Sequence, residues 1–168
     1  MARAKASRKY LLTFNNPLDH GYTHERIKAI LEEFPGRQYW CMCDEIGLET
    51  HTPHTHLFVV FRNGVMFETI HKRFYGVRID ESNGSNQENR EYVRKEGKWL
   101  NDAKHETNLA DTFEEWGELP PDRTRSETQA EQIMQMVMDG KSDAEILRQI
   151  PGAYNKLHHI QAARQTLL

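Results

Sequence analysis

The residues best suited to metal chemistry are two histidines in Pro53-His54-Thr55-His56. Residues i and i+2 of a strand face the same way, so both imidazoles can reach one ion. Imidazole binds several divalent metals. The chain has nine histidines, so a chance His-x-His pair without a metal is the alternative interpretation.

A carboxylate, Glu45, stands at the end of the preceding predicted strand, and residues 46–53 resemble a loop. If the two strands pair, Glu45 faces the two histidines. Two imidazoles and one carboxylate leave open positions on an ion, which a catalytic metal requires. The alternatives are a solvated strand end for Glu45, and Asp44, Glu49 or His51 as ligands. Structural zinc normally has four ligands, and only three good ones are found.

A third group of reactive residues is Tyr92-Val93-Arg94-Lys95 in a predicted helix. Residues i and i+3 of a helix are neighbours. A phenol has a reference pKa of about 10, so it is a poor nucleophile at neutral pH unless a cation or metal favours the phenolate. The alternative for Tyr92 is packing, with Lys95 as a solvated charge.

Charge and composition narrow the class of protein. The net charge of the 168 residues is −3, no apolar run is long enough for a membrane span, and the N-terminus lacks the apolar core of a signal peptide. The two cysteines, Cys41 and Cys43, form no disulfide framework. We therefore expect an intracellular protein without a membrane partner. A basic arm can neutralise DNA phosphates, or it is a solvated terminus. Its cations are Arg3, Lys5, Arg8 and Lys9.

Apolar periodicity predicts how these residues are positioned. Strands are expected at 9–15, 37–45, 55–62 and near 76–80, and helices at 23–34, 66–74 and 86–96, with Gly97 as a stop. The order of elements predicts an α+β fold.

The remaining residues are predicted to form a linker and a helical tail. The stretch 100–125 is polar and contains Pro120-Pro121. Capping boxes are expected at Ser126 with Gln129 and at Ser142 with Glu145, followed by a third helix from about 153. The predicted domains are 1–110, a linker at 111–125, and a helical segment at 126–168. The apolar positions of that segment are Ile133, Met134, Met136, Val137, Ile146, Leu147, Ile150 and Leu157.

Together, the motifs resemble the replication initiators (Rep proteins) of circular single-stranded DNA viruses and related rolling-circle plasmids, which are HUH endonucleases. Their first motif is similar to Leu12-Thr13-Phe14-Asn15-Asn16-Pro17, their second to Pro53-His54-Thr55-His56 with Glu45 upstream, and their third to Tyr92-Val93-Arg94-Lys95. Three ordered motifs are more specific than any one of them. Thr55 departs from the pattern, which has a hydrophobic residue there.

The resemblance implies a central antiparallel sheet of about five strands flanked by helices. It implies that Glu45, His54 and His56 hold Mg²⁺ or Mn²⁺, and that Tyr92 attacks single-stranded DNA at a stem-loop origin, with Lys95 assisting. This attack would give a 5′-phosphotyrosine and a free 3′-hydroxyl. The 3′-hydroxyl primes DNA synthesis, and reversal of the attack later rejoins the DNA ends. Thr13, Phe14, Asn15 and Asn16 are assigned with the basic arm to DNA binding. A helicase domain is expected to follow.

Other functions fit parts of the sequence. A relaxase or single-tyrosine transposase shares the chemistry, but Tyr-x-x-Lys and the upstream Glu45 argue against it. A non-catalytic single-strand binding module would use Tyr39, Trp40 and Phe58 as stacking platforms, although we expect them to be core. The tail is expected to pack on a second copy of the chain or on the helicase, with an independent small bundle as the alternative. A plasmid protein would act in a bacterial cytoplasm and a eukaryotic viral protein in a host nucleus.

Overall fold

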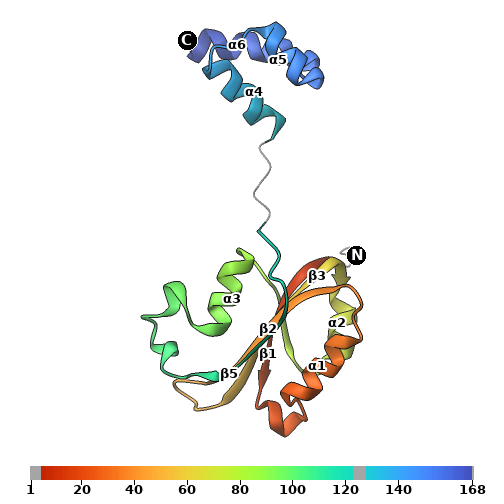
Figure 1. The fold of residues 1–168 in the computed structure, drawn as a ribbon, viewed down its shortest axis with the longest axis vertical. Helices are drawn as coiled ribbons and strands as arrows, with labels where there is room; N and C mark the ends of the chain where they lie inside the picture. The colour runs from red at the N-terminus through yellow and green to blue at the C-terminus, as the bar shows by residue number, and fades with distance from the viewer. Residues whose placement is uncertain (1–4, 123–127, 168) are drawn as a thin grey trace. The chain divides into compact units, whose positions relative to one another are not determined.

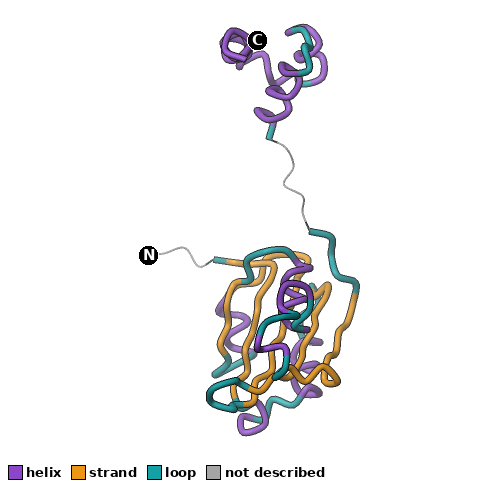
Figure 2. Tube along the Cα trace, turned by 90° about the vertical axis from the view of Figure 1, so that its left-hand side faces the viewer, coloured by secondary structure: helices purple, strands orange, loops and turns teal. Residues whose placement is uncertain are grey.

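The computed structural model describes residues 5–122 and 128–167. The chain divides into two compact units, Met1–Asp122 and Arg123–Leu168. The first unit is an α+β fold built on a five-stranded antiparallel sheet, and the second is helical (Figures 1 and 2). The predicted fold class is confirmed.

The sheet has the strand order β4-β1-β3-β2-β5, and each paired strand is antiparallel to its neighbour. Strand β3 is the central strand, so it has a partner strand on both sides. It carries the predicted His-x-His pair. The strands are β1 (Ala6–Asn15), β2 (Arg37–Ile46), β3 (Pro53–Met66), β4 (Arg78–Glu81) and β5 (Asn108–Gly117).

Helices cover both faces of this sheet. Figure 1 shows α1 (His24–Glu32) and α2 (Phe67–Arg73) on one face and α3 (Asn86–Arg94) on the other. Helix α1 begins as predicted, because the Thr23 hydroxyl accepts a hydrogen bond from the Arg26 N–H at 3.2 Å. Short 3₁₀ turns follow β1 at Pro17–His20 and connect α3 to β5 at Gly97–Trp99 and Ala103–His105.

Each face of the sheet has its own apolar cluster. On the α1/α2 face, alternate residues of β1 such as Leu12 and Phe14 pack against Ile27 and Leu31 of α1. On the α3 face, Cys41, Cys43 and Phe58 pack with Val93 of α3. The alternation follows from the two-residue period of a strand.

The predicted linker at 111–125 is wrong over its first half, because residues 108–117 form strand β5 beside β2. As an edge strand, β5 has only one neighbour, so its composition is polar. Two of its acids are ion-paired: Glu114 contacts His24 and Lys28, and Glu115 contacts Arg90. The boundary between the units accordingly lies after Asp122 rather than near residue 110.

The second unit contains α4 (Gln129–Met138), α5 (Asp143–Gln149), a 3₁₀ segment (Pro151–Lys156) and α6 (Leu157–Leu167). The capping box of Ser142 with Glu145 is confirmed. The first box is different from the prediction, because Thr128 with Glu131 caps α4; Ser126 lies outside the described residues.

Six of the eight predicted apolar positions of the second unit, all except Met134 and Leu157, belong to one small cluster. Ile133, Val137 and Ile146 are buried together with Ala153 and Ile160. Met136, Leu147 and Ile150 pack against this cluster, whereas Met134 is 43% exposed. These contacts lie within one chain, as the independent-bundle alternative requires, and self-association stays a prediction.

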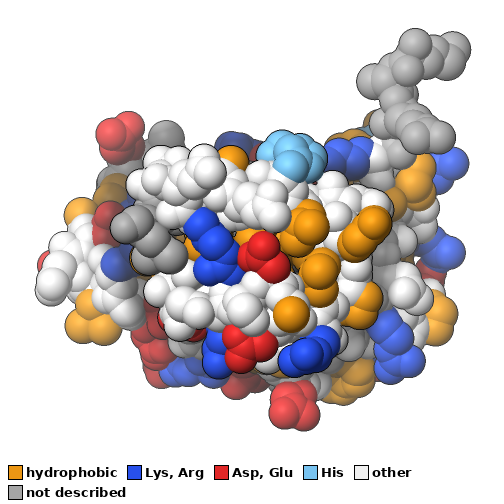
Figure 3. Space-filling view, turned by 90° about the horizontal axis from the view of Figure 1, so that it is seen from above, with side chains coloured by type: hydrophobic (Ala, Val, Ile, Leu, Met, Phe, Trp, Pro, Cys, Tyr) orange, Lys and Arg blue, Asp and Glu red, His pale blue; other side chains and the backbone are white. Residues whose placement is uncertain are grey.

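On the face seen in Figure 3, charged and apolar side chains are interspersed. Within the described residues, no helix has the length and apolarity needed to cross a membrane.

Candidate active site

The sheet register places the predicted ligands on the face that α3 covers. Glu45 of β2 is the direct cross-strand partner of His54 on β3, and Cys43 is the partner of His56. On the other side of β3, Thr13 of β1 pairs with His56, and its hydroxyl oxygen lies 3.2 Å from His56 Nδ1. Three adjacent strands therefore contribute to one polar patch.

Glu45 lies at the centre of this patch and is 5% exposed. Its Oε2 atom is 3.2 Å from His56 Nε2 and 3.0 Å from Lys95 Nζ. Burial opposes ionisation of this carboxyl, but the contacts with His56 and Lys95 outweigh burial and lower its pKa to about 2. Glu45 is therefore an anion throughout the neutral pH range.

Lys95 lies just after the end of α3, whereas the sequence predicted it to be inside the helix. Helix α3 ends at Arg94, two residues before the predicted end, and Lys95 has a left-handed backbone conformation (φ 54°). Its side chain is completely buried, and Nζ donates a hydrogen bond to the Tyr92 carbonyl at 3.0 Å. Burial lowers the pKa of this ammonium, and Glu45 opposes the shift.

Two residues that follow α3, one in a 3₁₀ turn and one at the start of β5, hold this helix end. The carbonyl of Lys95 accepts a hydrogen bond from His105 Nδ1 at 3.0 Å, and the carbonyl of Arg94 accepts one from Asn108 Nδ2 at 3.0 Å. These contacts satisfy carbonyls that the helix itself leaves open. The sequence contains no local signal for either residue, because they follow the helix by ten residues or more.

Tyr92 lies over the patch. Its ring packs edge-to-face on His56 at a centroid distance of 5.4 Å and on Trp99 at 5.2 Å. Lys95 Nζ is 3.7 Å from the centroid of the Tyr92 ring, within the range of a cation–π contact. Tyr92, Lys95, Glu45 and His56 are thus brought together from three segments of the chain.

The environment of Tyr92 keeps its phenol protonated at rest. Burial raises the pKa of Tyr92, the nearby Glu45 and Asp80 raise it further, and Arg78 lowers it. Arg78 and Asp80 are two residues apart on β4, pair with Thr13 and Leu11 of β1, and form an ion pair at 2.9 Å. A cavity of about 380 Å³ opens beside Tyr92 and includes Leu11, Asp80 and Trp99 in its walls. Motif spacing did not indicate Arg78.

Helix α3 is attached to the sheet through β5. The guanidinium of Arg90 donates two hydrogen bonds to the carboxylate of Glu115, at 2.9 and 3.0 Å. The same carboxylate accepts a hydrogen bond from the Tyr39 hydroxyl at 2.6 Å. Bidentate pairs of this kind fix orientation as well as distance, so they hold the helix that carries Tyr92.

The three predicted metal ligands have suitable donor types on one face but do not all converge. Glu45 and His56 are in contact, whereas the rings of His54 and His56 are 6.2 Å apart. Among the described residues, no group of three or more His, Cys, Asp or Glu side chains has metal-binding geometry. The expectation that all three side chains lie within reach of one ion is therefore not met.

One buried atom nevertheless agrees with a ligand role. His54 Nδ1 is a buried nitrogen that has no hydrogen-bond partner within the described part of the chain. Burial and the neighbouring His56 lower the pKa of His54, which favours the neutral imidazole that metals bind. In donor type, and because they share one face of the sheet, Glu45, His54 and His56 suit a divalent ion, although their side chains do not meet at one point in this structure.

The predicted DNA-binding residues have different outcomes. The assignment of Phe14 to DNA binding is wrong, because its side chain is 1% exposed and packs edge-to-face on Tyr22 and Phe74 in the α1/α2 core. Phe14 follows Thr13 on β1 and therefore points to the opposite face of the sheet. Thr13 lies on the site face beside His56. Asn15 is exposed, and the Asn16 N–H is bonded to the Pro53 carbonyl.

The basic arm is partly engaged within the protein. Lys5 pairs with Glu81, Arg8 Nε donates to the Phe61 carbonyl, and Lys9 donates to the Gly84 carbonyl. Arg3 lies outside the described residues. A role of these cations in DNA binding stays a prediction.

The platforms required by the non-catalytic alternative are buried. Tyr39 and Phe58 belong to the cluster under α3 and Trp40 to the cluster under α1. They are core residues, as expected, and cannot stack on bases while the sheet is folded.

The chain is distantly similar to viral replication-associated proteins. It is 30% identical over 96 residues to the replication-associated protein of Human associated cyclovirus 1 and 33% identical over 94 residues to that of Porcine circovirus 1. These matches cover 55% and 54% of the chain but only 32% and 28% of the relatives, so the chain spans about a third of their length or less. No protein-family model matches the chain.

Proposed function

We propose that the chain is a metal-dependent endonuclease and strand transferase that nicks and rejoins single-stranded DNA at a replication origin. The observation that carries the proposal is the convergence of Tyr92, Lys95, Glu45 and His56 on one sheet face. The similarity to two viral replication-associated proteins supports a role in replication initiation.

In the proposed reaction, the phenol oxygen of Tyr92 attacks the scissile phosphorus and its proton passes to solvent. The bond from phosphorus to the 3′-oxygen breaks, and the 3′-oxygen takes up a proton. A 5′-phosphotyrosine and a 3′-hydroxyl result, and the reverse attack of a 3′-hydroxyl rejoins the strand. Because burial raises the pKa of Tyr92, the attacking phenolate needs a stabilising cation.

The Lys95 ammonium supplies positive charge against the Tyr92 ring, where it favours an electron-rich phenolate. Glu45, His54 and His56 are the residues that would hold Mg²⁺ or Mn²⁺. When bound, such an ion polarises a phosphoryl oxygen. The Glu45 carboxylate keeps Lys95 charged and in place.

The test uses a library of random single-stranded DNA incubated with the full chain and Mn²⁺. We expect a covalent protein–DNA adduct that survives denaturation, with Tyr92 carrying the phosphate. Tyr92→Phe removes one oxygen and should abolish the adduct, because the attacking atom is gone, while the fold and DNA affinity persist. Lys95→Ala should reduce the yield less, since it forms no bond.

Tyr75→Phe is the matched control, because this tyrosine is 78% exposed and belongs to none of the three motifs. It should form the adduct like the unaltered chain. A denaturation-resistant adduct with Tyr92→Phe would mean that another residue is the nucleophile.

A further inference from the structure

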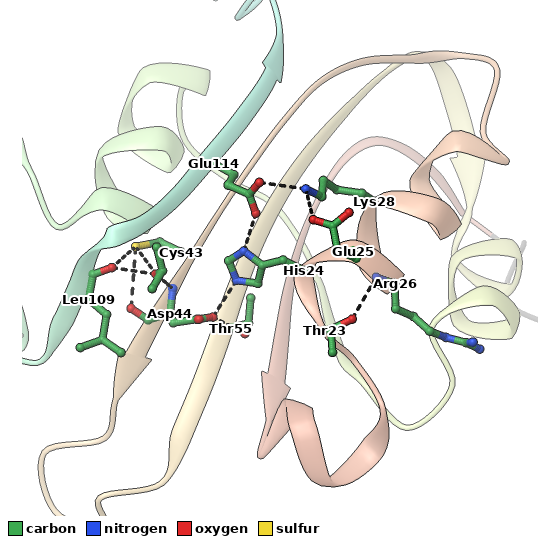
Figure 4. A network of polar contacts seen from close by, with 11 residues as sticks. Thr23, His24, Glu25, Arg26, Lys28, Cys43, Asp44, Thr55, Leu109 and Glu114 are labelled. Atoms are coloured by element: carbon green, nitrogen blue, oxygen red, sulfur yellow. Dashed lines mark hydrogen bonds and ion pairs between the residues drawn. The ribbon is translucent and has the colours of Figure 1, made fainter.

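A polar network lies directly behind the candidate metal ligands, on the α1 face of the sheet (Figure 4). Thr55 stands between His54 and His56 and points to the opposite side of β3. Its hydroxyl donates a hydrogen bond of 2.5 Å to Asp44 Oδ1. Thr55 and Asp44 are direct cross-strand partners, and Asp44 immediately precedes Glu45.

His24, the first residue of α1, ties this pair to two further elements. Its Nε2 lies 2.9 Å from Asp44 Oδ1 and its Nδ1 lies 2.6 Å from Glu114 Oε2 of β5. Figure 4 shows the ring between the two carboxylates, with Lys28 of the same helix on the far side of Glu114. The contact with Asp44, aided by Glu114 and opposed by burial, raises the pKa of His24, which favours the form with a donor on both nitrogens.

The register makes this network relevant to the ligands. The Asp44–Thr55 pair lies between the Glu45–His54 and Cys43–His56 pairs. A bond between side chains 44 and 55 therefore restrains the two strand segments that carry all three candidate ligands. A hydrophobic residue at position 55, which the resembled superfamily has there, makes no such bond.

We propose that His24, Asp44 and Thr55 are positioning residues that hold Glu45, His54 and His56 in register for a divalent cation. The inference rests on the metal site of the proposed function. Groups hydrogen-bonded directly to metal ligands change metal affinity about 10- to 100-fold when removed. His24, Asp44 and Thr55 act through the strands instead, so we expect an effect at the lower end of that range.

The experiment measures Mn²⁺ binding to the full chain, without DNA, by electron paramagnetic resonance titration. Thr55→Val keeps the shape of the side chain and removes only the hydroxyl. We expect its half-saturating Mn²⁺ concentration to rise about 10-fold. Thr55→Ser restores the donor and should bring the value back toward that of the unaltered chain.

His24→Gln is a second variant, useful because the His24 side chain is 21% exposed and outside the core. It loses one of the two contacts of the ring and should weaken Mn²⁺ binding in the same direction. Glu25→Gln is the matched control. Its carboxylate is 84% exposed and contacts only Lys28 in the same network, so its Mn²⁺ titration should not change.

Each outcome decides the inference. The inference is overturned if Thr55→Val and His24→Gln bind Mn²⁺ as tightly as the unaltered chain. This holds even if both variants are less stable to heat, because lower stability with unchanged Mn²⁺ binding is what a purely structural role predicts. An unaltered chain that binds no Mn²⁺ also overturns it. Weakened Mn²⁺ binding by these variants, with no DNA adduct from the unaltered chain, supports the positioning role and rejects the proposed nuclease function alone.

Discussion

The two faces of the sheet differ in what they bury. The α1/α2 face holds a cluster of 15 buried hydrophobic residues, including Tyr10, Phe14, Phe61 and Phe74, whereas the cluster on the α3 face has six. The α3 face instead buries Glu45, His56 and Lys95, and α3 itself contributes Asn86 and Asn89. The side chains buried on the α1/α2 face are mainly apolar, whereas those buried on the α3 face include charged groups.

The difference shows how a small domain combines stability with a polar site. A buried charge is tolerated only with partners, and each on the α3 face has them: Glu45 contacts Lys95 and His56. Such pairs add little net stability, because desolvation offsets their attraction. The apolar α1/α2 face must therefore supply most of the hydrophobic stabilisation.

The largest stability effect should come from Phe14→Ala on the apolar face. Removing this buried ring should lower the free energy of unfolding by about 3–5 kcal/mol, as measured by urea denaturation. Leu18→Ala, at a position 74% exposed, is the control and should change it by about 0.5 kcal/mol or less.

The same variant also tests the division of labour between the faces. At a temperature where Phe14→Ala is folded, its adduct yield with single-stranded DNA should match that of the unaltered chain. If the folded variant has a much lower affinity for DNA, Phe14 takes part in DNA binding after all.

A smaller effect is expected from Lys95→Met on the polar face. Glu45 loses its ammonium partner but keeps His56, so the cost should be about 1.5–3 kcal/mol, the usual range for a hydrogen bond to a charged group. Lys98→Met is the control, because Lys98 is 63% exposed and 3.7 Å from Glu88. Equal unfolding free energies for the two variants would contradict the assigned role of the buried ion pair.

The smallest effect concerns the attachment of α3 through Glu115. The contact with Arg90, followed by that with Tyr39, lowers the pKa of Glu115 from 4.5 to about 2. Its contribution is therefore present above pH 4.5 and is lost as the pH falls from 4.5 toward 2. Because this carboxylate is 38% exposed, the contribution should be about 0.2–1 kcal/mol.

Glu115→Gln should make the acid-induced loss of stability shallower in that window. Glu118→Gln, at an exposed position just after β5, is the control and should leave the slope unchanged. Chemical denaturation at a series of pH values measures how the free energy of unfolding of both variants depends on pH. If this dependence is the same for Glu115→Gln and the unaltered chain, the ion pair of Glu115 does not contribute to stability.

Local sequence determined much of the candidate site. Period-two alternation is sufficient to put His54 and His56 on one face of a strand, and a loop of suitable length brings Glu45 opposite His54. Capping residues and apolar spacing located α1 and α3 to within a few residues. These features depend on neighbours in sequence, so they can be inferred without the fold.

Tertiary structure alone decided the remainder, because it depends on partners distant in sequence. The acidic residues 111–117 resemble a linker until β2, Lys28 and Arg90 lie beside them. Lys95 lies just beyond its helix and contacts Glu45, and His105 and Asn108, from the segment that leads into β5, hold that helix end. The link from His24 through Asp44 to Thr55 joins residues up to 31 positions apart. Such contacts form only when the sheet has assembled, and no local pattern encodes them.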